Sequence, residues 1–259
     1  MKSIVRHIPN TLTCISLAFG FYAAILGISG DYSGAMIAIF IAAIFDFSDG
    51  LAARLLKAYS AMGKELDSLA DIISFGVAPG MMLFSFLDKL LYTLSWNDSW
   101  ICKLFLLAAF AIPVFSGLRL AKFNIDERQK TSFIGFPVPA HAILWSSLIV
   151  ALSPAVIIYG DDSYGIFQLS QFITSITPEA LLIGLSIAAV ATSLLLVSEI
   201  PMFSLKISSF TWKENKLQYI LILSAILLIT LFGIIGISAT ILLYILLSVI
   251  SYQDKSKPQ

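Results

Sequence analysis

Eight long apolar stretches constrain the fold of this chain more than any other feature. A helix needs about 20 mostly apolar residues to cross roughly 30 Å of hydrocarbon. Windows of that length predict spans at 11–29, 32–57, 66–87, 101–122, 139–158, 178–197, 217–235 and 237–252. Only residues 233–236 separate the last two spans, so seven spans is the alternative. The sequence therefore predicts an all-α, polytopic integral membrane bundle of about eight transmembrane helices.

The composition excludes two other classes of protein. Apolar residues make up 58% of the chain and charged residues 12%, whereas soluble domains carry about 25% charged residues. Sixteen Lys and Arg residues balance sixteen Asp and Glu residues. A nucleic-acid binder needs a basic excess to neutralise phosphates. We therefore expect neither a water-soluble globule nor a nucleic-acid partner.

The basic residues predict the orientation of the spans. Cytoplasmic loops of membrane proteins carry an excess of Lys and Arg. Fourteen of the sixteen basic residues lie at span ends on the same side of the membrane as the two termini. The exceptions are Lys89 and Lys103. We therefore expect cytoplasmic termini, an even number of spans and one membrane domain over residues 1–259. A short interfacial segment is expected to precede the first span, which carries no cleavage site of a signal peptide.

Four aspartates occupy the cytoplasmic ends of two consecutive spans. Asp46 and Asp49 are three residues apart, and Asp67 and Asp71 are four apart, so each pair lies on one helix face. The short connection through Gly63 makes the two helices antiparallel neighbours, which predicts that the four carboxylates converge on one pocket. Ionisable residues within membrane spans are costly and usually functional.

Four converging carboxylates require protons or cations between them. Their hard oxygen ligands suit magnesium, manganese or calcium, and no Cys and His cluster suggests zinc. Gly50 and Ala53 continue the acidic face and leave room for a ligand to approach the backbone, and Arg54 is placed to meet a phosphate. One acidic pair alone would usually be interfacial or salt-bridged, but the joint pattern predicts a metal-dependent pyrophosphate site.

The aspartates and the residues around them form a pattern that resembles a known family. The pattern D-x-x-D-G-x-x-A-R, eight residues, then G-x-x-x-D-x-x-x-D is that of the CDP-alcohol phosphatidyltransferases, and every fixed position is matched. Pro9, Asn10 and Thr13 are similar to the entry of the first span in that family. Four further segments resemble its serine-using branch: 67–80, 115–124, 135–140 and 198–206. The resemblance covers about 8–206 and leaves 217–252 as additional C-terminal spans.

The resemblance implies a reaction and most of its site. The phosphatidyl group of CDP-diacylglycerol would pass to the hydroxyl of L-serine, giving phosphatidylserine and CMP. Two divalent ions, Mg²⁺ or Mn²⁺, would be held by Asp46, Asp49, Asp67 and Asp71, with Asp71 also the proton acceptor. The CDP-diacylglycerol contacts would be Asn10, Thr13, Gly50, Ala53 and Arg54. The family also implies a homodimer among membrane lipids, in the bacterial cytoplasmic membrane with a cytoplasmic active site.

The acceptor amino acid needs a partner for its carboxylate. Arg119 and Asn124 lie at the cytoplasmic end of the fourth span, and an arginine pairs with a carboxylate through two parallel hydrogen bonds. Ser74, three residues beyond Asp71, is a third candidate for serine binding. The alternative roles are membrane anchoring for Arg119 and helix packing for Ser74.

Two competing functions remain open on the sequence. Glycerol-3-phosphate or inositol phosphate would serve as acceptor in the same chemistry, and Arg119, Lys122, Arg128 and Lys130 offer a basic cluster for either. In a different class, the carboxylates would bind the coupling ion of a transporter. Such sites lie near the bilayer midplane between structural repeats. Here the aspartates lie near the cytoplasmic span ends, and the sequence has no repeat.

Overall fold

Helices form at each predicted span in the part of the chain that the computed structural model describes, which is residues 7–96, 99–126, 133–153, 176–203, 211–212 and 215–256. The first half contains α2 (Ile8–Ser29), α3 (Tyr32–Leu55), α4 (Ala61–Asp71), the π-helix η1 (Ile72–Val77), α5 (Ala78–Thr93), α6 (Trp100–Lys103), the 3₁₀-helix η2 (Leu104–Leu106) and α7 (Leu107–Ile125). The second half contains β1 (Phe133–Ile134), α8 (Val138–Leu152), α11 (Pro178–Val197), β2 (Pro201–Met202), α12 (Lys216–Phe232) and α13 (Ile234–Ser256).

The helices confirm an all-α polytopic membrane bundle. Within the described residues, six helical stretches are long and apolar enough to cross a membrane, and α8 and α12 are shorter apolar helices. The predicted break at 233–236 separates α12 from α13, where Gly233 has a φ of 61°. The predicted interfacial segment before the first span and residues 154–158 of the fifth predicted span lie outside the described residues.

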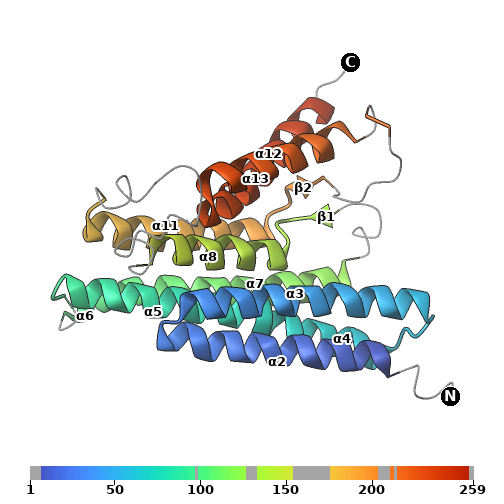
Figure 1. Ribbon diagram of the computed structural model, residues 1–259, viewed down its shortest axis with the longest axis horizontal. Coiled ribbons are helices and arrows are strands. Elements are labelled where there is room, and N and C mark those ends of the chain that lie inside the picture. The colour runs from blue at the N-terminus through green and yellow to red at the C-terminus, as the bar shows by residue number, and fades with distance from the viewer. Residues whose placement is uncertain are drawn as a thin grey trace.

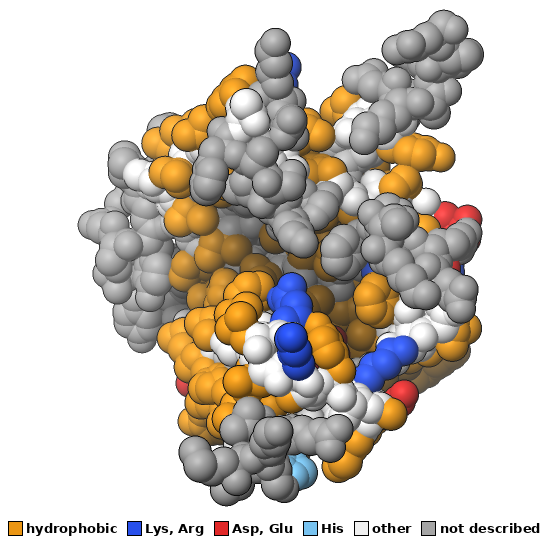
Figure 2. All heavy atoms as spheres, turned by 90° about the vertical axis from the view of Figure 1, so that its right-hand side faces the viewer, with side chains coloured by type: hydrophobic (Ala, Val, Ile, Leu, Met, Phe, Trp, Pro, Cys, Tyr) orange, Lys and Arg blue, Asp and Glu red, His pale blue; other side chains and the backbone are white. Residues whose placement is uncertain are grey.

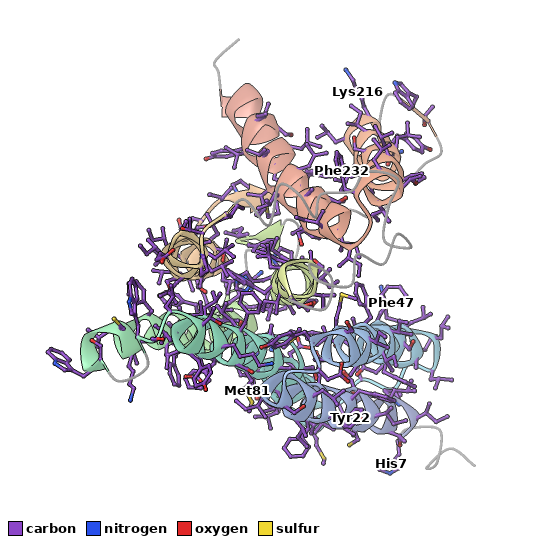
Figure 3. The ribbon with its side chains drawn as sticks, turned by 60° about the vertical axis from the view of Figure 1, so that its left-hand side comes forward. His7, Tyr22, Phe47, Met81, Lys216 and Phe232 are labelled. Atoms are coloured by element: carbon purple, nitrogen blue, oxygen red, sulfur yellow. The ribbon has the colours of Figure 1, made fainter. Side chains whose placement is uncertain are left out.

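The helices form layers that bring the predicted site to one end of the bundle (Figure 1). Helices α2, α3, α5 and α7 make up the first layer, and α8 and α11 pack against one side of this layer. Helices α13 and α12 run obliquely over α8, and α12 packs mainly against α13 (Figure 3). The start of α2, the end of α3, the start of α4 and the end of α7 all lie toward the right-hand end of Figure 1.

The first two spans form a tight hairpin because small residues face each other. The turn between them is made by Gly30, in the left-handed region with φ 87°, and by Asp31, whose side chain accepts a hydrogen bond from Gly34 N at 2.9 Å. Ser16 of α2 donates to Ala42 O of α3 at 2.9 Å. Small buried residues and interhelical hydrogen bonds are the usual stabilising contacts between membrane helices.

The third span is one helical run in which the hydrogen bonding changes immediately after Asp71. Residues 61–93 pass from α4 through η1 into α5. Single π turns inside α-helices occur often at functional sites. The backbone of α2 comes close to η1 at Gly20, and Ser74 of η1 donates a hydrogen bond to Ser16 O at 3.1 Å. This contact fixes the third span, and with it Asp67 and Asp71, against the first.

We predict that Gly20→Ala destabilises the protein. The new Cβ would lie 2.5 Å from Ser74 Cα, so α2 and η1 must separate, at a cost of about 1–3 kcal/mol. The matched control is Gly184→Ala in α11, where a Cβ meets nothing within 4 Å. Thermal unfolding in detergent should show a lower Tm for Gly20→Ala alone. Equal melting of the two variants would contradict this close packing.

Candidate active site

Three of the four predicted acidic residues meet at the ends of α3 and α4. Asp46, Asp49 and Asp67 each offer a carboxylate oxygen, and these oxygens all lie within 4.8 Å of one another. Asp49 is buried, and the other two are half-buried. Such a group of hard oxygen ligands is able to hold a divalent cation. The spacing of these residues in the sequence thus predicted the cluster correctly.

Asp71 lies next to this cluster, at the last residue of α4. Its carboxylate interacts electrostatically with those of Asp46, Asp67 and Asp49. The Oδ1 atom of Asp71 is buried and has no hydrogen-bond partner among the described residues. A buried carboxylate oxygen without a partner is costly unless a cation or a proton satisfies it. Asp46, Asp49 and Asp67 therefore fit a metal site by both their chemistry and their geometry, and the buried oxygen of Asp71 fits it by its chemistry.

A pocket of about 220 Å³ opens beside the carboxylates, between α2, the end of α3 and the start of α4. Six of its lining residues were predicted for the site: Asn10, Thr13, Asp49, Gly50, Ala53 and Asp67. The other lining residues are Pro9, Ala58, Tyr59, Ser60, Gly63 and Lys64. The first span thus contributes to the same pocket as the two acidic helices.

Thr13 connects the first span directly to the acidic cluster. Its hydroxyl donates to Asp49 Oδ2 at 2.5 Å, and both side chains are buried. A hydrogen bond to a metal ligand orients the ligand and tunes its affinity. Asn10, one helical turn earlier, reaches across to Gly63, where a Cβ would lie 3.0 Å from the Asn10 side-chain oxygen.

Gly50 lies on the open side of the pocket, one helical turn before Arg54. A Cβ at Gly50 would meet nothing within 4 Å, so this glycine leaves free space beside the carboxylates. Arg54 Nε donates to Gly50 O at 3.0 Å, which lays the exposed guanidinium along α3. Arg54 itself lies outside the residues that line the pocket.

Four pocket residues were not predicted for the site from the sequence: Ala58, Tyr59, Ser60 and Lys64. Ser60 caps α4 by accepting a hydrogen bond from Gly63 N at 2.9 Å, and its position three residues before a glycine is the only local signal for it. Lys64 lines the pocket and donates to Asn124 O at 3.1 Å. The turn between α3 and α4 therefore forms the outer wall of the pocket.

The three predicted serine-binding residues have different neighbours. Arg119 is buried in α7, with its Cζ 5.1 Å from the ring centroid of Phe123. Asn124 donates to Ser68 Oγ at 2.8 Å on the outer side of α4. Ser74 is fully buried between η1 and α2, where it donates to Ser16 O. A role of these three residues in serine binding stays a prediction.

Figure 2 looks onto the end of the bundle that contains the pocket. Lys and Arg side chains are visible on this face, together with acidic side chains nearer its edges. Near the pocket, the described basic residues are Arg54 and Lys57 at the end of α3 and Lys64, which lines the pocket. Basic side chains beside an acidic cluster suit a metal-bound anionic substrate.

Comparisons with known proteins agree with this geometry. Residues 6–177 match a family model described as CDP-alcohol phosphatidyltransferase. A Bacillus subtilis CDP-diacylglycerol–serine O-phosphatidyltransferase is 35% identical over 167 residues, which cover 64% of this chain and 89% of that protein. The Helicobacter pylori (strain 26695) enzyme of the same name is 34% identical over 52% of this chain and 54% of its own.

An archaeal relative is also similar to this chain. An archaetidylserine synthase from Methanothermobacter thermautotrophicus is 31% identical over 142 residues, which cover 54% of this chain and 56% of that protein. The matched residues contain all four aspartates and the pocket between α2, α3 and α4. On this evidence the chain is an integral membrane protein that belongs to the metal-dependent CDP-alcohol phosphatidyltransferase family.

Proposed function

We propose that this protein is a CDP-diacylglycerol–serine O-phosphatidyltransferase, which makes phosphatidylserine and releases CMP. The observation that carries the proposal is the meeting of Asp46, Asp49 and Asp67 beside a pocket of about 220 Å³ at the helix ends. Several similar proteins share this enzyme name, and one is covered over 89% of its length. Serine is favoured over a phosphorylated acceptor on the strength of these relatives.

Four carboxylates hold the cofactor in this proposal. Asp46, Asp49, Asp67 and Asp71 would ligate two Mg²⁺ or Mn²⁺ ions, with Thr13 orienting Asp49 through its hydrogen bond. When bound, such ions neutralise the pyrophosphate and the charge that develops during phosphoryl transfer. The buried, unpartnered Oδ1 of Asp71 supports its inclusion in the ligand set.

The nucleotide part of the lipid is expected in the 220 Å³ pocket. Asn10 and Thr13 present polar groups from α2, and Gly50 and Ala53 leave space along α3. Arg54 extends from the adjacent turn of α3 and would meet a phosphate oxygen. The acyl chains would then remain in the bilayer while the reacting phosphorus lies at the carboxylates.

Asp71 is the proposed general base. It would accept the hydroxyl proton of serine as the serine oxygen attacks the phosphorus that bears diacylglycerol. The bond from that phosphorus to the oxygen of CMP breaks, so CMP leaves and phosphatidylserine remains. A base must lie within hydrogen-bond reach of the proton that it removes. Arg119 would bind the carboxylate of serine, together with Asn124 and Ser74.

We also propose that both termini and the active site face the cytoplasm of a bacterium and that the protein is a homodimer. The orientation is supported by the basic side chains on the end of the bundle that contains the pocket (Figure 2). A cytoplasmic site has direct access to serine and allows CMP to leave into water. The dimer rests on the family alone.

An acceptor screen with purified protein tests the proposed reaction. With CDP-diacylglycerol and Mg²⁺ or Mn²⁺, we expect CMP release that depends on L-serine, stops after chelation of the metal and returns when metal is added. Glycerol-3-phosphate and inositol phosphate, tested in parallel, should release little CMP. Turnover with glycerol-3-phosphate but not with serine would replace the proposed acceptor, and metal-independent turnover would contradict the carboxylate mechanism.

We predict that Asp71→Asn lowers the rate of CMP release by about 100-fold or more, because an amide cannot accept the serine proton. Metal-dependent binding of CDP-diacylglycerol, measured by calorimetry, should survive at least in part because three carboxylates remain. The matched control is Asp88→Asn, an exposed aspartate in α5, which should keep wild-type activity. A nearly normal rate in Asp71→Asn would show that another group serves as base.

A further inference from the structure

A short β-ribbon closes the bundle beside Arg119. Strands β1 and β2 pair antiparallel, with Phe133 opposite Met202 and Ile134 opposite Pro201. The pairing continues as Gly135 N donates to Ile200 O at 2.9 Å and Phe136 N donates to Leu195 O at 3.1 Å. We refer to residues 133–136 and 195–203 together as the clasp.

The clasp lies directly against Arg119. Gly135 has a φ of 80°, and a Cβ there would lie 2.6 Å from Leu196 O, 3.0 Å from Ser198 O and 3.4 Å from Arg119 Nε. Only glycine combines this left-handed conformation with so close an approach. The backbone at Gly135 is thus packed between the end of α11 and the guanidinium of Arg119, and it limits where that guanidinium can lie.

The adjacent turn of α7 is also bound to the clasp. Lys122 Nζ donates to Val197 O at 3.4 Å and lies 3.6 Å from Glu199 Oε1. On the inner side, the ring of Phe136 packs edge-on against His141 of α8, with ring centroids 5.6 Å apart. The clasp therefore connects α7, α8 and α11 at the end of the bundle that contains the pocket.

The last helix holds the free end of the clasp. Tyr244 of α13 is buried, and its hydroxyl donates to Phe203 O at 3.1 Å. Its ring packs edge-on against that of Phe203, with centroids 4.9 Å apart. Helix α13 is itself fixed to α8 by the buried pair Ser147 and Ser238, whose hydroxyl oxygens are 2.7 Å apart. A contact from α13 thus reaches Arg119 through the clasp.

The second half of the clasp and Tyr244 lie beyond residue 177, where the match to the family model ends. The metal and nucleotide residues all lie within the matched part. Gly135, which contacts Arg119, lies within the matched part, whereas the residues 195–203 that pack on Gly135 and pair with its strand lie outside it. The clasp is thus completed by residues separate in sequence from the metal and nucleotide residues.

We propose that the clasp is one wall of the acceptor site and that Tyr244 is a positioning residue, which holds the clasp closed so that Arg119 is fixed for the acceptor carboxylate. This inference rests on the proposed function, in which Arg119 binds serine. It also gives the C-terminal pair of helices a role in the reaction. Fixing a guanidinium before binding lowers the entropy cost of ordering it with the substrate.

The test is Tyr244→Phe in the full-length protein, with steady-state kinetics against serine and CDP-diacylglycerol separately. Phenylalanine keeps the ring packing on Phe203 and removes only the hydroxyl. We expect the KM for serine to rise roughly three- to tenfold, as for the loss of one net hydrogen bond. The kcat and the KM for CDP-diacylglycerol should stay within about twofold of wild type, because one hydrogen bond distant from the nucleotide pocket is removed.

Tyr252→Phe, an exposed position on the same helix, is the matched control and should leave both KM values unchanged. An unchanged serine KM in Tyr244→Phe overturns the proposal, and so does a uniform loss of kcat with a lower Tm, which indicates a purely structural role. Wild-type protein without serine turnover refutes the proposed function instead. If wild-type protein uses another acceptor, the KM for that acceptor is compared between wild type and Tyr244→Phe. A raised KM would show that the clasp controls acceptor binding.

Discussion

The structure depends on four carboxylates being placed together at the ends of two helices that cross a membrane. Like charges at this spacing repel, and burial makes that repulsion stronger than it is in water. Such a cluster persists only where protons or cations compensate its negative charge. The site therefore requires bound protons or cations. Thr13 and the close contact of α2 with η1 stabilise the arrangement, because they fix the acidic helices against the first span.

Different parts of the chain form the acidic site and the contacts around Arg119. The first three spans create the acidic cluster and the nucleotide pocket, and both lie within the residues that match the family model. The later helices α8, α11 and α13 support the clasp against Arg119. The first three spans thus contain the residues for the chemistry common to the family. The later helices are proposed to affect acceptor binding through their contacts with Arg119.

The sequence predicted the spans and the acidic cluster because both have regular patterns. Apolar windows of membrane length identify helices, and the spacing of Asp46, Asp49 and Asp67 places them on facing helix surfaces. The π-helix after Asp71 and the two-residue strands of the clasp have no comparable signal, since they arise from tertiary packing. Ser74 shows the same limit: its spacing from Asp71 is visible in the sequence, but its hydrogen bond to Ser16 O depends on how η1 packs on α2.

Binding of Mn²⁺ in the absence of substrate, measured by electron paramagnetic resonance, tests the central claim most directly. Asp46 interacts with each of the other three carboxylates, so Asp46→Asn should weaken Mn²⁺ binding by about tenfold or more relative to wild type, since a metal ligand is lost. Glu179→Gln, at the opposite end of the bundle, should leave binding unchanged. Equal Mn²⁺ affinity and stoichiometry in wild type and Asp46→Asn would contradict a metal site formed by these aspartates.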